Sequence, residues 1–237
     1  RGFNLTTANK MQVLMDGRNL YSPLFSGVFW DVQNYPLEDL DRIEVIRGPG
    51  ATLWGANAFN GVINIISKSA QETQGGLITA GGGGEEAGFG SVRYGGKLAT
   101  NSYYRVYLDY FNRDDMVHAN GEPARDNMML GQTGFRTDTQ LNDVNALTVQ
   151  GDYYNGVYGI ENQDDGRVHG GNLLGRWTRT FSPESELVVQ SYFDATHRGQ
   201  FNFIEDLYTY DIDAQHRLPI GNRQLFLYGL EYRLASD

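Results

Sequence analysis

The residues best suited to binding are four aromatic side chains on one connecting segment of the chain. Tyr21, Phe25, Phe29 and Trp30 lie within the segment 19–31, which separates two apolar runs. Exposed rings gathered on a connection are typical of a binding surface. The same rings could instead pack against neighbouring protein, and the sequence leaves both interpretations open.

Charged side chains follow on the next apolar segment, at Arg42, Glu44 and Arg47. Side chains alternate along a strand, so Arg42 and Glu44 are expected on one side of it. If these charges are buried they need partners, and losing one partner would cost roughly 3–5 kcal/mol. If they are solvated, their ion pairs contribute little.

No constellation of residues predicts catalysis, a metal site or a cofactor. Cysteine is absent, which excludes thiol nucleophiles, disulfides and cysteine zinc sites. The acidic loop around Asp164 and Asp165 lacks the alternating spacing of a calcium loop. His118 and His169 are the candidates for a haem ligand, but histidines scattered over the surface are the favoured interpretation. We therefore expect a protein that is not an enzyme.

Composition limits the class of protein. The net charge of -10 argues against a nucleic-acid partner. Mean hydropathy is -0.46, and no apolar run approaches the ~18 residues of a membrane-spanning helix. A helical membrane protein is thereby excluded. A β-barrel is compatible with these values, because half of its strand residues can be polar.

Residues 76–237 repeat one pattern of alternating apolar and polar residues separated by connections. In the segment 103–113, Tyr104, Val106, Leu108 and Tyr110 would form one apolar face, and charged residues the other. The pattern predicts nine antiparallel strands, near 76–84, 88–98, 102–113, 127–138, 143–154, 169–181, 185–198, 207–219 and 223–235.

The connections between these predicted strands alternate in length. Short turns are expected at 99–101, 140–143, 182–185 and 219–222, and longer loops at 112–126, 155–169 and 199–206. Short turns on one side and long loops on the other indicate an outer-membrane barrel. A soluble β-sandwich also alternates. The strand length, the polar second face and the aromatics near strand ends favour the barrel.

The most specific signal lies in the first third of the chain. The run VLMDG at 13–17 and the run DRIEVIRGPGATLWGANAFNGVINIISK at 41–68, in this order before the barrel strands, resemble TonB-dependent outer-membrane receptors. The resemblance implies an all-β membrane protein: a plug domain (1–75, its C-terminal part) and the first part of a transmembrane β-barrel (76–237). A complete member has about 22 strands, so about nine are expected here and the chain is expected to be incomplete at both ends.

The resemblance also implies function and partners. It implies a bacterial outer-membrane location and active uptake of a scarce nutrient, a ferric siderophore by default, with cobalamin, haem or another metal chelate as alternatives. Energy would come through TonB, whose box would lie upstream of Arg1. The implied partners are TonB, outer-membrane lipid and a small-molecule ligand.

Site roles follow from the same resemblance. The plug loop with Tyr21, Phe25, Phe29 and Trp30 would meet the ligand, and Arg42, Glu44 and Arg47 would anchor the plug to acids of the barrel wall. Alternatives from other classes are a passive porin-like channel and a soluble β-sandwich binding module.

Overall fold

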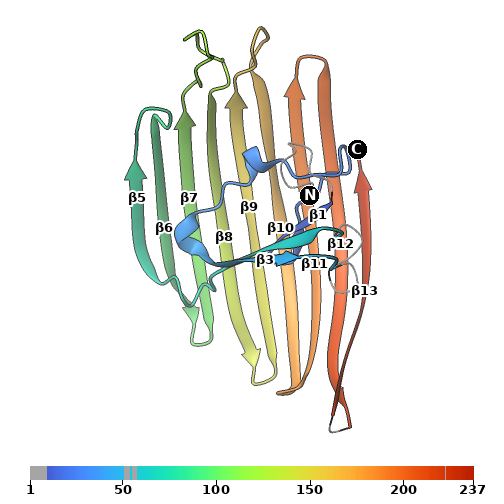
Figure 1. The fold of residues 1–237 in the computed structure, drawn as a ribbon. Coiled ribbons are helices and arrows are strands. Elements are labelled where there is room, and N and C mark those ends of the chain that lie inside the picture. Colours follow the sequence, from blue (N-terminus) through green and yellow to red (C-terminus); the bar gives the residue numbers. More distant parts are fainter. Residues whose placement is uncertain (1–9, 51–53, 55–57, 222) are drawn as a thin grey trace. The chain divides into compact units, whose positions relative to one another are not determined.

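The chain divides into two compact units, Arg1–Lys68 and Ser69–Asp237. The computed structural model describes residues 10–50, 54, 58–221 and 223–237 (Figure 1). We describe each unit by itself. In these described residues no helix is both long enough and apolar enough to cross a membrane.

The first unit is built on a four-stranded mixed sheet in the order β2-β1-β4-β3. β1 runs parallel to β4, whereas the pairs β1–β2 and β3–β4 are antiparallel. The strands are β1 (Met11–Met15), β2 (Arg18–Asn19), β3 (Leu40–Arg47) and β4 (Gly61–Ser67), with 3-10 turns η1 (Trp30–Val32) and η2 (Leu37–Asp39) between β2 and β3.

The core of this unit joins the sheet to the connection that follows it. Val13 and Met15 of β1 are buried against Leu20 and Val28. Each buried aliphatic side chain contributes about 1.5–3 kcal/mol. The connection is therefore held to the sheet at its start and near its middle.

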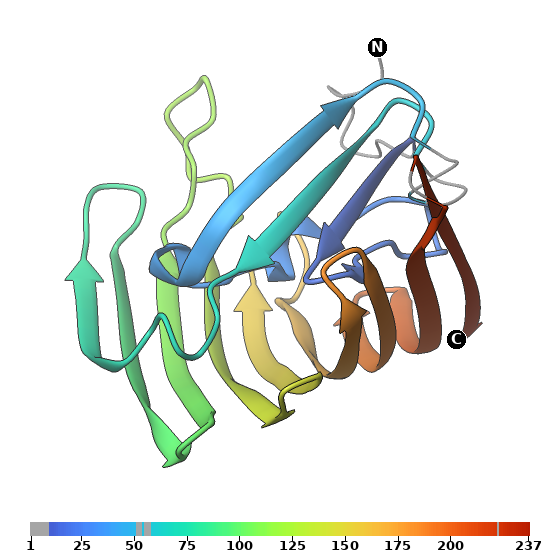
Figure 2. The same ribbon diagram turned by 90° about the horizontal axis from the view of Figure 1, so that it is seen from below.

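The second unit is a nine-stranded antiparallel sheet in which every strand pairs with its neighbours in sequence, from β5 to β13. Seen from below, the sheet curves into an arc (Figure 2). Its strands are β5 (Gly75–Gly81), β6 (Gly88–Ala99), β7 (Ser102–Arg113), β8 (Met128–Asn142), β9 (Asn145–Tyr158), β10 (Gly166–Ser182), β11 (Ser185–Gln200), β12 (Phe203–Ile220) and β13 (Gln224–Ser236).

All nine predicted strands are present, and the antiparallel all-β prediction is confirmed. One predicted loop is wrong. The sequence pattern predicted a long connection over 199–206, but β11 ends at Gln200 and β12 begins at Phe203. Asn202 has a φ of 62° there, which a turn asparagine tolerates. The strands extend because residues 203–207 continue the ladder opposite 196–200.

The two faces of this sheet differ in character. On β7, Val106, Leu108 and Tyr110 are exposed, while Tyr107 and Phe111 alternate with them and are buried. We call the face that carries Leu108 the apolar face, and the face that carries Arg105 and Tyr107 the polar face. One register row of the apolar face reads Tyr94, Val106, Phe135, Gly151, Leu173, Phe193, Tyr210 and Leu234.

Candidate functional site: an aromatic loop and two charged clusters

The aromatic connection of the first unit is held in place by a small turn. The backbone N–H of Ser22 donates to the carbonyl of Gly27 over 2.7 Å, and Ser26 between them has a φ of 56°. The ring of Phe25 folds over Gly27, where an added Cβ would lie 2.3 Å from a ring carbon. Glycine at position 27 thus permits the position of the Phe25 ring.

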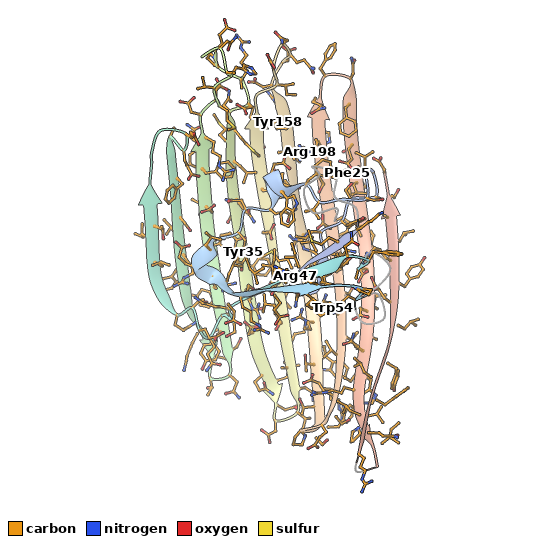
Figure 3. All side chains as sticks on the ribbon, in the orientation of Figure 1. Phe25, Tyr35, Arg47, Trp54, Tyr158 and Arg198 are labelled. Carbon is orange, nitrogen blue, oxygen red and sulfur yellow. The ribbon has the colours of Figure 1, made fainter. Side chains whose placement is uncertain are left out.

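The four predicted aromatics fall into three environments. Phe25 and Phe29 form an edge-to-face pair with ring centroids 4.8 Å apart, a geometry that aromatic rings favour. Trp30 is half exposed. Tyr21 packs against the core of the unit, and this burial raises the pKa of its hydroxyl, opposed by a hydrogen bond with Ser26. Phe25 is labelled in Figure 3.

The Asp-Gly turn after β1 contains a structural carboxylate that sequence reasoning missed. Asp16 is 5% exposed. Its carboxylate accepts from the backbone N–H of Ser67 at 2.9 Å and from the Ser67 hydroxyl at 2.6 Å. The end of β4 is therefore tied to the turn after β1. The sequence marked Asp16 only as a turn residue, since its partner lies far along the chain.

The charged strand β3 lies at an edge of the sheet and is exposed. Arg42 pairs with Glu44 over 2.8 Å and also with Asp41. Glu44 accepts a second hydrogen bond from Asn64 at 3.0 Å. The bonds from Arg42 and Asn64 lower the pKa of Glu44, and those to Glu44 and Asp41 raise the pKa of Arg42.

Arg47 stands apart from this cluster. It is exposed at the end of β3 (Figure 3), and no ion pair with another described residue is recorded for it. Of the three predicted anchoring residues, the structure brings together Arg42 and Glu44, and leaves Arg47 with its guanidinium available.

A second charged cluster lies on the polar face of the nine-stranded sheet. Asp138 on β8 accepts from Arg136 at 2.8 and 3.1 Å and from the Thr148 hydroxyl at 2.7 Å. It also accepts the backbone N–H of Ala70 at 2.7 Å, and Ala70 is fully buried. The segment just before β5 is therefore fastened to the sheet through one carboxylate.

The same face continues as a row of polar residues across the strands. Arg105, Arg136 and Gln150 are register partners on consecutive strands, and the row ends with Asp211 paired to Arg233 over 2.9 Å. Arg105 and Asp211 are nearly inaccessible. Among the described residues, no group of three or more His, Asp or Glu side chains could hold a metal ion.

Comparison with known families identifies the first unit. The family model described as TonB-dependent Receptor Plug Domain matches residues 1–62. The vitamin B12 transporter BtuB of Vibrio vulnificus is 35% identical over 96 residues, 39% of this chain and 15% of that protein. The ferric enterobactin receptor of Pseudomonas aeruginosa is 28% identical over 203 residues, 73% of this chain and 26% of that protein.

Solved structures extend the likeness to the whole fold. The siderophore receptor PirA from Pseudomonas aeruginosa superposes with a TM-score of 0.74 over 96% of this chain and 40% of its own, at 20% identity. At that identity the superposition shows the fold alone. The chain thus spans well under half the length of the proteins it matches.

Proposed function

Because this chain belongs to the TonB-dependent receptors of the bacterial outer membrane, we propose that the protein containing it actively imports a scarce nutrient, bound as a small molecule. The proposed partners are TonB, which supplies energy, and outer-membrane lipid. We propose no catalytic activity. A passive porin would have no use for a plug domain, which the first unit matches over residues 1–62.

The ligand we propose is a ferric siderophore. The supporting observation is the extent of the match: similarity to a ferric enterobactin receptor covers 73% of this chain, against 39% and 64% for two vitamin B12 transporters. The longer match reaches into the strands that carry the loops, and loops carry specificity in such folds. The higher identity of the shorter match keeps vitamin B12 as a second candidate.

Uptake by cells that express the intact receptor tests this function. We expect radioactive iron supplied as ferric enterobactin to accumulate, and a proton uncoupler or loss of TonB to abolish the accumulation. Cyanocobalamin accumulation without iron uptake would transfer the assignment to vitamin B12. Entry of small sugars that persists in uncoupled cells would overturn active transport in favour of a passive channel.

We further propose that Phe25, Phe29 and Trp30 contact the ligand, and that Tyr21 holds their loop. Half of the Trp30 surface is open to solvent, and exposed rings of this kind often dominate binding energy. Trp30→Ala should weaken binding by the intact receptor roughly tenfold or more. Leu37→Ala is the matched control, since Leu37 is a more exposed apolar residue of the same unit. Equal affinities for the two variants would remove Trp30 from the site.

For Arg42, Glu44 and Arg47 we propose the anchoring role. Arg47 supports it most directly, because its exposed guanidinium has no ion partner among the described residues of its own unit. Arg47→Gln should then raise hydrogen exchange over β3 of the intact receptor. Arg113→Gln, at an exposed strand end, is the control and should leave β3 unchanged.

A further inference from the structure

The apolar face of the nine-stranded sheet contains an open depression, of about 380 Å³, over strands β9 to β12. Its floor is a register row in which Gly171 and Ala195 stand between Tyr153 and Tyr208. Two small residues between two tyrosines leave a hollow. We call this depression the notch.

Rings and aliphatic groups close the other two sides of the notch. One row below the floor lie Leu173 and Phe193, and the Phe193 ring stacks near Tyr208 with centroids 6.3 Å apart. One row above lie His169 and His197, whose rings stack at 4.6 Å. An open hollow flanked by side chains on four sides admits the end of a narrow chain, but not a helix of about 10 Å diameter.

The floor of the notch cannot be filled by an ordinary side chain at Gly171. A Cβ there would lie 2.5 Å from the carbonyl oxygen of Asp152. The close backbone packing of β9 and β10 therefore keeps the floor of the notch without a side chain at this position.

Polarity changes steeply along β10 at this point. On the apolar face the strand presents Leu173, Gly171, His169 and then Arg167 toward the connection 159–165. Arg167 is exposed and forms no ion pair with the described part of the chain. His197 is bonded through Nδ1 to Asp206 at 2.6 Å, which leaves His169 and Arg167 to meet an anion.

The level of the notch matches the edge of a bilayer. On the same face of β10, Arg179 is the charged residue nearest the short turn, and 12 residues separate it from Arg167, or ~40 Å along the strand. A tilt of ~40° reduces this to ~30 Å of height, just beyond an apolar band of ~25 Å. Gly171, between them, would thus lie within the apolar band, and Arg167 just outside it, toward the lipid phosphates.

From this geometry we propose that the notch binds one phosphate-bearing lipid of the outer membrane. One acyl chain enters between Tyr153 and Tyr208, and the phosphate accepts hydrogen bonds from Arg167 and from the His169 ring. This inference rests on the membrane location within the proposed function. It adds a specific lipid site on the outside of the sheet, separate from nutrient uptake.

Native mass spectrometry of the intact receptor, titrated with phosphatidylglycerol or with diacylglycerol, tests the proposal. We expect one phosphatidylglycerol to be retained and diacylglycerol to be lost. Ala195→Leu should displace about two methylene groups of the acyl chain and lower retention roughly tenfold. Ala214→Leu, on the same face of β12 but away from the notch, should retain lipid as the unchanged receptor does.

A second variant keeps the test decisive if Ala195→Leu does not fold. Arg167→Gln combined with His169→Gln changes only partly or fully exposed polar groups and should weaken phosphatidylglycerol retention while leaving the folded fraction intact. Equal phosphatidylglycerol retention in both variants and in the unchanged receptor would overturn the proposal. Binding of diacylglycerol as tight as that of phosphatidylglycerol would also overturn it, and so would a mass of a receptor dimer without bound lipid. Iron uptake by the unchanged receptor is measured in parallel. Uptake without any retained phosphatidylglycerol overturns the notch alone, and retained phosphatidylglycerol without uptake overturns the proposed function alone.

Discussion

Asp16 contributes more to the stability of the first unit than its place in a turn suggests. It has a φ of 49° and a buried carboxylate that binds both donors of Ser67. Removing that carboxylate takes away the acceptor of a buried N–H and of a hydroxyl. We expect Asp16→Ala to destabilise this junction by roughly 1.5–3 kcal/mol.

Hydrogen exchange of the Ser67 amide in the intact receptor measures this effect. Exchange should accelerate roughly 10- to 100-fold. Asp16→Asn is the control, because asparagine tolerates the positive φ and still accepts one hydrogen bond. An Ser67 amide that stays equally protected in the alanine variant would contradict the assigned role.

The pair of Arg42 and Glu44 gives a prediction in pH. The pKa of Glu44 is lowered from its ordinary value of 4.5 by bonds from Arg42 and Asn64. A lowered folded pKa means that the pair's contribution is complete above pH 4.5 and is lost as the pH falls through the folded value. We therefore expect the chemical shift of the Arg42 Nε to stay constant at neutral pH and to change only as the pH falls below 4.5.

Glu44→Gln isolates that effect. The glutamine variant should lose the step in the Arg42 Nε chemical shift that belongs to Glu44, although Asp41 still pairs with Arg42. An unchanged profile would mean that Asp41 alone holds the guanidinium.

Among elements, the segment before β5 gives the clearest prediction. Ala70 is fastened to the sheet by Asp138, which Arg136 holds in turn. Asp138→Ala removes one partner of a largely buried pair, which costs up to about 3–5 kcal/mol, and it releases the segment. A spin label at the exposed Gln71 should become mobile in this variant of the intact receptor.

The matched control for that label is Asp143→Ala, at an exposed two-residue turn between β8 and β9. It removes the same group from the same region without touching Ala70. If the label moves equally in both variants, the fastening does not depend on Asp138. The absence of cysteine from this stretch of the chain keeps its labelling specific.

Strand patterning could be predicted well from sequence, and contacts between distant residues could not. The alternation through Val106, Leu108 and Tyr110 marked β7 because a strand places its side chains on two unlike faces. The same reasoning placed strand ends poorly near Asn202, since polar residues there continue the ladder of β12. It predicted the four aromatic residues of the loop as one group. The different burial of Tyr21, which packs against the core, and of Trp30, which is half exposed, depends on tertiary packing that the sequence pattern does not show.

At the scale of the whole molecule, the exposed apolar face gives a direct test of membrane embedding. Leu108 lies mid-strand on that face and is 59% exposed. A charge there should oppose insertion, by somewhat less than the ~2–4 kcal/mol found for basic residues at mid-bilayer. Leu108→Asp should lower the yield of folded intact receptor in phosphatidylcholine bilayers.

Leu108→Ala is the control for lost side-chain volume, and it should fold nearly as well as the unchanged protein. The folded fraction can be read from the shift in gel mobility between unheated and boiled samples. If the aspartate variant folds as efficiently as the alanine variant, the apolar face does not contact lipid at Leu108.

The sequential order of the nine strands has a consequence for how such a molecule diversifies. Every strand from β6 to β13 is bonded to the strand before it in the chain, so each hairpin is a self-contained module. Duplicating or deleting one hairpin changes the circumference without rethreading any other strand. The tips of the hairpins can likewise be exchanged between relatives while the ladder beneath them stays in register. The number of strands and the ligand specificity can therefore evolve independently, because they depend on separate parts of the same polypeptide.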